Sequence, residues 1–513
     1  MSIYLAGIDI GTTGAKGMIF DLAGNVKGVA YYEYPCTYPK PAWVEQDPDL
    51  LVDSAMKAMK DAVVKSGIPS SEIISVSLSA QRCCGIFLDR DENLLRPMIS
   101  WQDNRTPAEV EDIAAKIDPA EYYKRTGYPN STTWLLSKML WVRKNEPVIW
   151  DKTARIVQMH DYFLRALGVD DYYVDHNDAG YFGVFDNVKG EWDRELLTMF
   201  DIDESLLPKH GKSGTLVGTV SKEASERCSL AVGTKISIGA GDQSAGSVGA
   251  GIVHKGLLSI SMGTAGAVTA YLDSPFRDPN CANIATAHPI DGCWLLEGYQ
   301  AAAGGVYRWF RDEVGGTEMA EAEKTGRDFF AIMNEKIEQV PAGSNGLLVM
   351  PYFASAGTPR YNPSARGTII GLTFAHSRFE LARAFMEGIT MDMRDMLNSM
   401  KNSNVAIKEA RILGGPTKSE VWNQIQSDIY GIPVDTLKVG DATVLGAAIL
   451  GGVGAGVFSS IEEGADKMVA LEKRYEPNME NHGVYNKLYD TYCRAYDGLN
   501  DNGVFASIAE LQK

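Results

Sequence analysis

The sequence has few cysteines, and their spacing matches neither a metal site nor a disulfide framework. Seven cysteines lie at irregular positions among 513 residues, and Cys83 and Cys84 are adjacent rather than separated by two residues. An odd number of cysteines in a chain long enough to form a large core indicates reduced thiols and a cytoplasmic protein.

A hydrophobic run long enough to cross a membrane is also missing. The longest apolar stretch, residues 444–458, is too short for a span and is interrupted by glycines. We therefore expect a tightly packed, glycine-faced helix inside a domain, and no membrane partner. No signal peptide is expected either, because residues 1–5 run directly into the first predicted strand.

Basic residues are outnumbered by acidic ones. The 49 Lys and Arg residues against 66 Asp and Glu residues leave a net charge of −17. Such acidity favours solubility and argues against nucleic acid as a partner. The hydrophobic fraction of 45% is that of an ordinary globular protein, and the length predicts two large domains rather than a single core.

Residues 8–21, which read IDIGTTGAKGMIFD, predict a strand, a Gly/Thr turn and a second strand. Their spacing fits neither a Rossmann fingerprint nor a Walker loop. A Gly/Thr hairpin can still bind phosphate through converging N–H groups and hydroxyls, and Asp9 before it could hold a hydrated Mg²⁺. The alternative is a plain tight hairpin in which Asp9 only forms hydrogen bonds to the turn.

A second stretch, residues 260–267, repeats this motif in register. It reads ISMGTAGA and matches Ile8, Gly11, Thr12, Gly14 and Ala15. The repeat predicts two lobes of related topology, each presenting a Gly/Thr hairpin to a shared cleft. This arrangement resembles the superfamily of sugar kinases, hexokinase, actin and the heat-shock ATPases.

Asp242 follows a predicted strand and is flanked by glycines that allow close approach. A helix that starts just after Asp242 would place backbone dipoles beside its carboxylate, which suits either a general base or a helix cap. The two phosphate-binding hairpins that flank this residue in sequence favour the base.

Further polar residues are expected where strands end, since α/β sheets bind ligands there. The predicted strand 73–80 leads into Gln81, Arg82 and Cys83. Residues 101–105 follow as a second polar cluster, for which the alternative is a helix start with solvated Asp103 and Arg105.

Other segments carry weaker signals. An amphipathic pattern predicts a core helix over 132–145 with Lys138 exposed. Residues 171–192 are rich in Asp, Asn, Gly and aromatics, which predicts a long irregular segment near the mouth of a cleft. A strand that starts at Arg411 runs into a glycine turn that could admit a base and ribose or form a simple connection.

Taken together, these motifs resemble the FGGY family of carbohydrate kinases over nearly the whole chain. The second family signature is largely present at 367–387, and the first survives at 138–145 with Leu135 where a small residue is usual. The resemblance implies an α/β fold of two RNase H-like domains of the actin and hexokinase superfamily, residues 1–252 and 253–513, which flank an ATP cleft. The matching segments are 7–20, 81–105, 239–249, 261–266 and 414–458.

The resemblance also implies a role for individual residues in a kinase that uses ATP and Mg²⁺. Asp242 would be the catalytic base for a primary hydroxyl, and Asp9 would position the metal. The residues implied in substrate binding are Gln81, Arg82, Cys83, Trp101, Asp103, Asp242 and Gln243. Those implied in ATP binding are Gly11, Thr12, Thr13, Lys16, Gly263, Thr264, Gly414, Gly415 and Ser419.

The substrate-binding positions mix two subfamilies. Segments 45–48, 140–147 and 304–312 look like xylulose kinases, whereas Gln81 and Arg82 look like glycerol kinases. Glycerol kinases place a glutamate after this arginine, and the cysteine found here cannot replace a carboxylate as an acceptor for two hydroxyls.

We therefore expect a small open-chain acceptor, with a pentulose such as xylulose favoured over glycerol or another polyol. Its partner is a small molecule, and a homodimer would be in keeping with the resemblance. A protein of another class, an actin-like regulatory nucleotide-binding protein, is the alternative. The set of polar residues, which matches the size of a sugar, argues against it.

Overall fold

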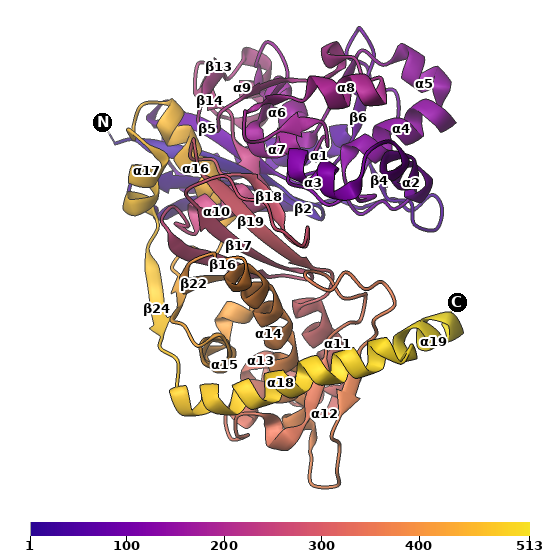
Figure 1. The fold of residues 1–513 in the computed structure, drawn as a ribbon. Helices are drawn as coiled ribbons and strands as arrows, with labels where there is room; N and C mark the ends of the chain where they lie inside the picture. Colours follow the sequence, from indigo (N-terminus) through magenta and orange to yellow (C-terminus); the bar gives the residue numbers. More distant parts are fainter. Residues whose placement is uncertain (1, 513) are drawn as a thin grey trace.

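The first lobe is built around the predicted Gly/Thr hairpin. The computed structural model describes residues 2–512, and Figure 1 shows its two lobes one above the other. Strands β1 and β2 pair antiparallel, and β1 pairs parallel with β5. The seven-stranded sheet has the order β13-β14-β5-β1-β2-β3, with β15 beside β5. Its strands are β1 (Tyr4–Ile10), β2 (Gly14–Asp21), β3 (Val26–Glu33), β5 (Ile73–Ala80), β13 (Leu216–Thr219), β14 (Lys235–Ser237) and β15 (Ala240–Gly241).

The second lobe repeats this arrangement. Its seven-stranded sheet has the order β18-β19-β17-β16-β22-β23-β24, in which β16 pairs antiparallel with β17 and parallel with β22. The repeated motif therefore reflects a repeated topology, and the predicted α/β fold of two related lobes is confirmed. The strands are β16 (Gly256–Met262), β17 (Gly266–Leu272), β18 (Ile284–Ala287), β19 (Trp294–Gln300), β22 (Ile407–Gly414), β23 (Val434–Leu437) and β24 (Leu471–Tyr475).

Helices cover both sheets, and their ends follow from the sequence. Helix α1 (Pro48–Ser66) packs on β2 and β3, and the Asp47 carboxylate accepts the N–H groups of Asp49 and Leu50 at its start. In the second lobe, α14 (Arg378–Asn402) packs on β17, β19 and α15 (Glu420–Tyr430). The long α18 (Met479–Asp501) also packs on α15, and α19 (Val504–Leu511) follows it.

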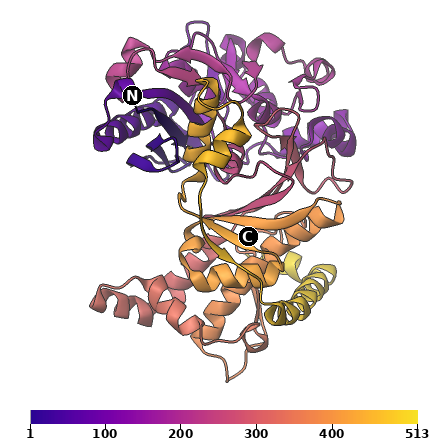
Figure 2. The same cartoon turned by 90° about the vertical axis from the view of Figure 1, so that its left-hand side faces the viewer.

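One stretch from the second half of the chain packs against the first lobe, and the division into domains at residue 252 stays a prediction. Helices α16 (Ala442–Gly454) and α17 (Ile461–Met468) lie between β23 and β24 in sequence, yet they pack on the first lobe, as both views show (Figures 1 and 2). Helix α16 contacts α10 (Asp242–Gly249), β1 and β5. It is apolar on all sides, so it requires a buried position, and the predicted glycine-faced helix is confirmed.

The prediction that Lys138 is exposed is wrong. Helix α4 (Leu135–Asn145) buries this side chain completely, and its Nζ donates to the carbonyl oxygens of Cys83 at 2.7 Å, Ser100 at 2.8 Å and Thr133 at 2.8 Å. Three carbonyl partners replace the water that a buried ammonium loses. Helical periodicity alone could not reveal these partners, because all three lie on other segments or before the helix.

The predicted irregular segment 171–192 instead forms short regular elements. It contains β9 (Tyr173–Asp175), α7 (His176–Gly180), β10 (Phe185–Asp186) and β11 (Glu191–Trp192), and most of its side chains are buried. Asp175 caps α7 by accepting the N–H groups of Asn177 and Asp178. The polar residues that suggested a loop are therefore helix-capping and interior residues.

Among residues 2–512, no helix combines the length and apolar character needed to cross a membrane. All seven cysteines are free thiols.

Helices α10 and α16 cross with their backbones in contact, and two glycines permit it. A Cβ added at Gly446 would lie 1.9 Å from the carbonyl oxygen of Ala245, and one at Gly249 would lie 1.8 Å from that of Ala442. We expect Gly446→Ala to force the helices apart and to lower stability by roughly 1–3 kcal/mol. Thermal unfolding followed by circular dichroism measures this loss.

Gly498→Ala is the matched control, because no atom lies within 4 Å of a Cβ at this position in α18. It should keep or slightly raise the melting temperature. Equal melting temperatures for Gly446→Ala and the wild type would contradict the close crossing.

Candidate active site

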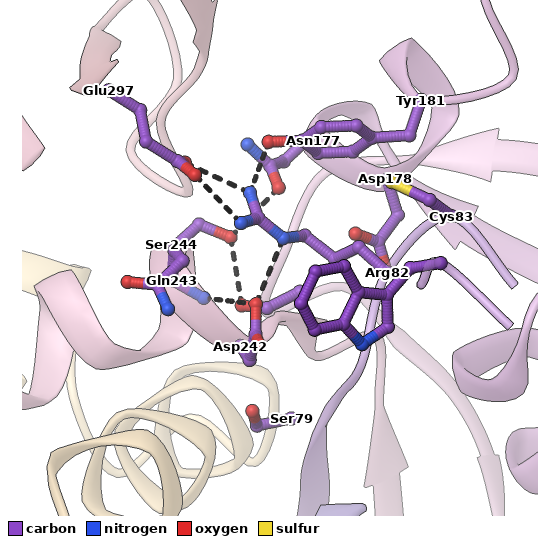
Figure 3. A network of polar contacts seen from close by, with 12 residues as sticks. Ser79, Arg82, Cys83, Asn177, Asp178, Tyr181, Asp242, Gln243, Ser244 and Glu297 are labelled. Atoms are coloured by element: carbon purple, nitrogen blue, oxygen red, sulfur yellow. Dashed lines mark hydrogen bonds and ion pairs between the residues drawn. The ribbon is translucent and has the colours of Figure 1, made fainter. Parts of the chain in front are cut away.

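Arg82 is the centre of a polar network between the two lobes (Figure 3). It follows β5, whereas Asp242 begins α10 and Glu297 lies in β19 of the second lobe. Its Nε is 2.9 Å from Oδ1 of Asp242. Its Nη1 and Nη2 donate to the two carboxylate oxygens of Glu297 at 3.0 and 2.9 Å. A single guanidinium therefore joins carboxylates from both lobes in the geometry of a bidentate pair.

Helix α7 and the turn after it form the wall behind Arg82. The guanidinium carbon lies 4.6 Å from the centre of the Tyr181 ring, and Nη1 donates to the Tyr181 hydroxyl. Asp178 is completely buried nearby, and neither of its carboxylate oxygens has a hydrogen-bond partner in the described part of the chain. Burial raises the pKa of Asp178 well above its usual range, which favours the neutral carboxylic acid.

Asp242 has the environment of a general base. It occupies the first turn of α10, where its Oδ1 accepts the N–H of Gln243 at 2.7 Å, and Gly241 rather than Asp242 is the N-cap. Its side chain is 34% exposed, so a small molecule can reach it. Burial raises the pKa of Asp242, which makes the carboxylate more basic, although the Arg82 charge opposes this rise. This setting favours the base over the plain helix cap.

The first hairpin brings Asp9 and Thr12 close to this network. Asp9 Oδ1 accepts the Ser79 hydroxyl at 2.8 Å, and burial raises the pKa of Asp9 to about 7. The Thr12 hydroxyl accepts the indole N–H of Trp101 at 2.8 Å. The side chain of Lys16 forms an ion pair with Asp441, directly before α16. Thr13, which is exposed, lies at the tip of the same turn.

The second hairpin and the glycine turn after β22 leave space of the kind that a nucleotide needs. A Cβ at Gly11 would meet its nearest atom at 3.4 Å and one at Gly263 at 3.9 Å, and Gly415 has no atom within 4 Å of its Cβ position. The carbonyl oxygen of Thr264 accepts the N–H of Ala303 at 2.9 Å, just before α11 (Gly304–Val314). Only atoms of the hairpins themselves lie within 4 Å of the Cβ positions of Gly11 and Gly263, and small residues at these positions suit a turn whose backbone N–H groups bind phosphate.

Gly414 and Ser419 frame this turn. Gly414 has φ of +96°, and Ser419 caps α15 by accepting the N–H of Trp422. The Ser419 hydroxyl donates to Asn334 at 2.9 Å and is buried, so it shapes the turn from behind. Its direct contact with adenosine stays a prediction.

Three of the predicted substrate residues are buried inside the first lobe rather than exposed beside Arg82. Gln81 is buried and donates to Gln46 at 2.9 Å. Asp103 is completely buried, where its Oδ1 accepts Arg105 Nε at 2.9 Å and its Oδ2 accepts the Val44 N–H at 2.6 Å. The alternative of a solvated Asp103 and Arg105 is therefore wrong. Cys83 is 4% exposed and belongs to an apolar aromatic cluster.

A second group of carboxylates lies deeper in the first lobe and has other roles. His160, Asp175 and Asp178 bring potential metal-ligating atoms within 4.8 Å of one another. However, His160 Nε2 accepts the N–H of Gly239 at 3.0 Å, and Asp175 caps α7. These contacts assign His160 and Asp175 to local structure, so Asp9 is the better candidate for a metal ligand.

Sequence reasoning missed Glu297 and Tyr181. Glu297 is the only charged residue in the strand sequence WLLEGYQ, which is otherwise mostly apolar and buried. A lone charge in a buried strand requires a partner, and this signal was available in the sequence. Tyr181 lay in the segment predicted to be irregular.

Comparison with known proteins covers both lobes. The N-terminal domain of the FGGY family of carbohydrate kinases matches residues 4–249, and its C-terminal domain matches residues 258–455. The chain is 29% identical over 504 residues to the xylulose kinase of Bacillus subtilis (strain 168), with 97% of each chain covered. It is 31% identical over 501 residues to a glycerol kinase of Thermococcus gammatolerans, with 96% of this chain and 97% of the relative covered.

Solved structures show the same architecture. The crystal structure of gluconate kinase from Lactobacillus acidophilus superimposes with a TM-score of 0.88 at 26% identity, covering 97% of this chain and 98% of that one. These three similar proteins are named after three different acceptors, so their names alone do not identify the acceptor of this chain.

The buried Lys138 offers a test of how the site is supported. Its ammonium holds the carbonyl of Cys83, next to Arg82, and burial lowers the pKa of Lys138. Lys138→Met would leave three buried carbonyl oxygens without this donor, which we expect to cost at least about 2 kcal/mol. The midpoint of urea unfolding measures the loss.

Lys152→Met at the end of the next helix, α5 (Pro147–Lys152), is the control, because the Lys152 side chain is exposed and forms no hydrogen bond or ion pair in the described chain. It should change stability by no more than about 0.5 kcal/mol. If the two variants unfold at the same urea concentration, the three carbonyl contacts do not stabilise the protein.

Proposed function

The chain belongs to the FGGY family of carbohydrate kinases, and on this basis we propose that it transfers the γ-phosphate of ATP to a primary hydroxyl of an open-chain pentulose such as xylulose. The observation that carries the proposal is Asp242, a reachable carboxylate of raised pKa that contacts Arg82 between the two lobes. The neighbouring Gly/Thr hairpins supply the phosphate site.

The hairpins and their glycines fit the triphosphate of ATP. Thr12, Thr13, Gly263 and Thr264 would bind its β- and γ-phosphates, and Lys16 would add a positive charge. Gly414, Gly415 and Ser419 would border the adenosine. Asp9 lies beside the first hairpin and near the carboxylates of Asp242 and Asp441, a setting that fits a hydrated Mg²⁺, which would neutralise charge on the phosphates.

Asp242 would act on the acceptor. Its carboxylate removes the proton from the attacking hydroxyl while Arg82 holds the neighbouring hydroxyls, so the acceptor oxygen is aligned with the γ-phosphate. Trp101, which contacts Tyr299 of the second lobe, and Gln243, which follows Asp242, would also contact the acceptor. Closure of the lobes around the acceptor would exclude water and so favour transfer over hydrolysis.

A polyol such as glycerol is the second candidate acceptor. The arginine after β5 and the Asp242-Gln243 pair resemble glycerol kinases, and a relative of that name is 31% identical. Cys83 weighs against glycerol, because a buried thiol in an aromatic cluster is a poor hydrogen-bond acceptor. A purely regulatory nucleotide-binding protein needs no polar network that could bind a sugar or polyol. The network of Asp242, Arg82 and Glu297 therefore argues against this class.

Asp242→Asn tests the general base. Loss of the basic carboxylate should lower kcat by about 10² to 10⁴ without preventing MgATP binding. Coupled ADP release measures the rate, and isothermal titration calorimetry measures nucleotide affinity. Asp273→Asn, which removes an exposed carboxylate paired with Lys255, should retain full activity. Wild-type turnover in Asp242→Asn would remove the base from the mechanism.

A panel of acceptors tests the substrate class. ADP release with MgATP should be stimulated most by one pentulose among D-xylulose, L-xylulose, D-ribulose and L-ribulose, and less by glycerol, erythritol, ribitol and xylitol. Best turnover of glycerol would favour the second candidate. ADP release of equal rate with and without any acceptor would instead favour the nucleotide-binding protein of another class.

A further inference from the structure

Strand β19 of the second lobe contacts residues that follow β5 and β7 (Met98–Ile99) of the first lobe through two of its side chains. Side chains alternate along a strand, so Glu297 and Tyr299 point to the same face. Glu297 contacts Arg82, and the Tyr299 ring lies edge-on to Trp101 with ring centres 6.4 Å apart. Both contacts reach residues that the sequence places in the substrate site, so the second lobe completes that site.

The position of Glu297 is fixed by the sheet. It pairs with Thr269 of β17 on one side and with Ile284 of β18 on the other, so its strand has neighbours on both edges. The residue is 4% exposed, and a buried carboxylate requires a charged or hydrogen-bonding partner. Arg82 is that partner, through two hydrogen bonds across the lobes.

The pair can recognise neighbouring hydroxyls of an acceptor. A hydroxyl can accept a hydrogen bond from a guanidinium and donate one to a carboxylate. Each carboxylate oxygen of Glu297 accepts one N–H from Arg82, and a carboxylate oxygen can accept a second hydrogen bond. The Cys83 thiol accepts hydrogen bonds poorly and packs among aromatic residues. Another side chain must therefore accept the hydrogen bonds that the substrate hydroxyls donate.

The charges around Arg82 also select among acceptors. One guanidinium faces two carboxylates, Asp242 and Glu297, and no second arginine or lysine forms an ion pair with either of them in the described chain. A sugar acid would have to displace Glu297 from Arg82 and place its own carboxylate beside the two already present. A neutral polyhydroxy compound meets no such repulsion.

We propose that Glu297 is a specificity-determining residue that supplies, from the second lobe, the carboxylate missing at position 83, and that it selects neutral polyhydroxy acceptors against aldonic acids. This inference rests on the proposed kinase function. Glu297 would be the residue by which the enzyme discriminates a ketose or polyol from an acid such as gluconate.

The test is Glu297→Gln, which keeps the side-chain shape and removes the charge. Kinetics with MgATP are measured for the neutral acceptor that the wild type uses best and for D-gluconate. We expect kcat/KM for the neutral acceptor to fall by at least about tenfold, mainly through KM, because a charged hydrogen-bond acceptor is lost. The ratio of D-gluconate to neutral-acceptor kcat/KM should rise by at least about tenfold, while KM for MgATP changes by less than about twofold.

Two further variants keep the result interpretable. Glu297→Asp retains the charge on a shorter side chain, so it should still discriminate against D-gluconate even where its KM for the neutral acceptor rises. Glu92→Gln removes an exposed carboxylate paired with Arg165 at 3.1 Å and should behave as the wild type. If Glu297→Gln does not fold, loss of discrimination in folded Glu297→Asp would overturn the inference, and retained discrimination would support it.

The outcomes separate this inference from the proposed function. A wild type that phosphorylates a neutral acceptor, together with a Glu297→Gln variant of unchanged acceptor preference, would overturn the role of Glu297 and leave the kinase assignment intact. A wild type that prefers D-gluconate would overturn the inference directly. A wild type that releases ADP with no acceptor would overturn the proposed function and the inference together.

Discussion

The interaction on which the active site depends is the double ion pair of Arg82 with Asp242 and Glu297. An arginine side chain that is 12% exposed needs counter-charges, and here they come from α10 of the first lobe and β19 of the second. Asp242 of the first lobe already balances the charge on Arg82, and the bidentate pair with Glu297 forms only when the two lobes stand close together. The same contact links Asp242, the base that we propose, to β19, so the placement of Asp242 and the placement of the two lobes depend on one residue.

Close backbone packing and hydrogen bonds hold the segments that carry Asp242 and Arg82. Helix α10, which begins with Asp242, crosses α16 at backbone contact distance through Gly249 and Gly446. The turn after β5, which carries Arg82 and Cys83, is held by the ammonium of Lys138 and by Gln158, whose Oε1 accepts the Cys83 N–H at 2.7 Å. Two independent supports thus fix the base and the arginine that contacts it.

Much of this fold could be predicted from the sequence, and the features that could not be predicted have one physical reason in common. Local patterns predicted both hairpins, the strand 73–80 and the core helix within 132–145, because turn chemistry and periodicity act over a few residues. They missed the burial of Lys138 and the pairing of Glu297 with Arg82, which lies 215 residues away in sequence. They also could not show that α16 packs against the first lobe, since an apolar sequence indicates that a helix is buried but not which elements bury it.

The path of the chain through α16 has a consequence for how the protein is made. The first sheet and α10 are complete in sequence by residue 249, yet the helix that covers β1, β5 and α10 is synthesised only after β23 of the second lobe. During translation this apolar face of the first lobe has no α16 to cover it until the chain has been synthesised beyond residue 454. The core of the first lobe is therefore completed only after most of the second lobe has been made.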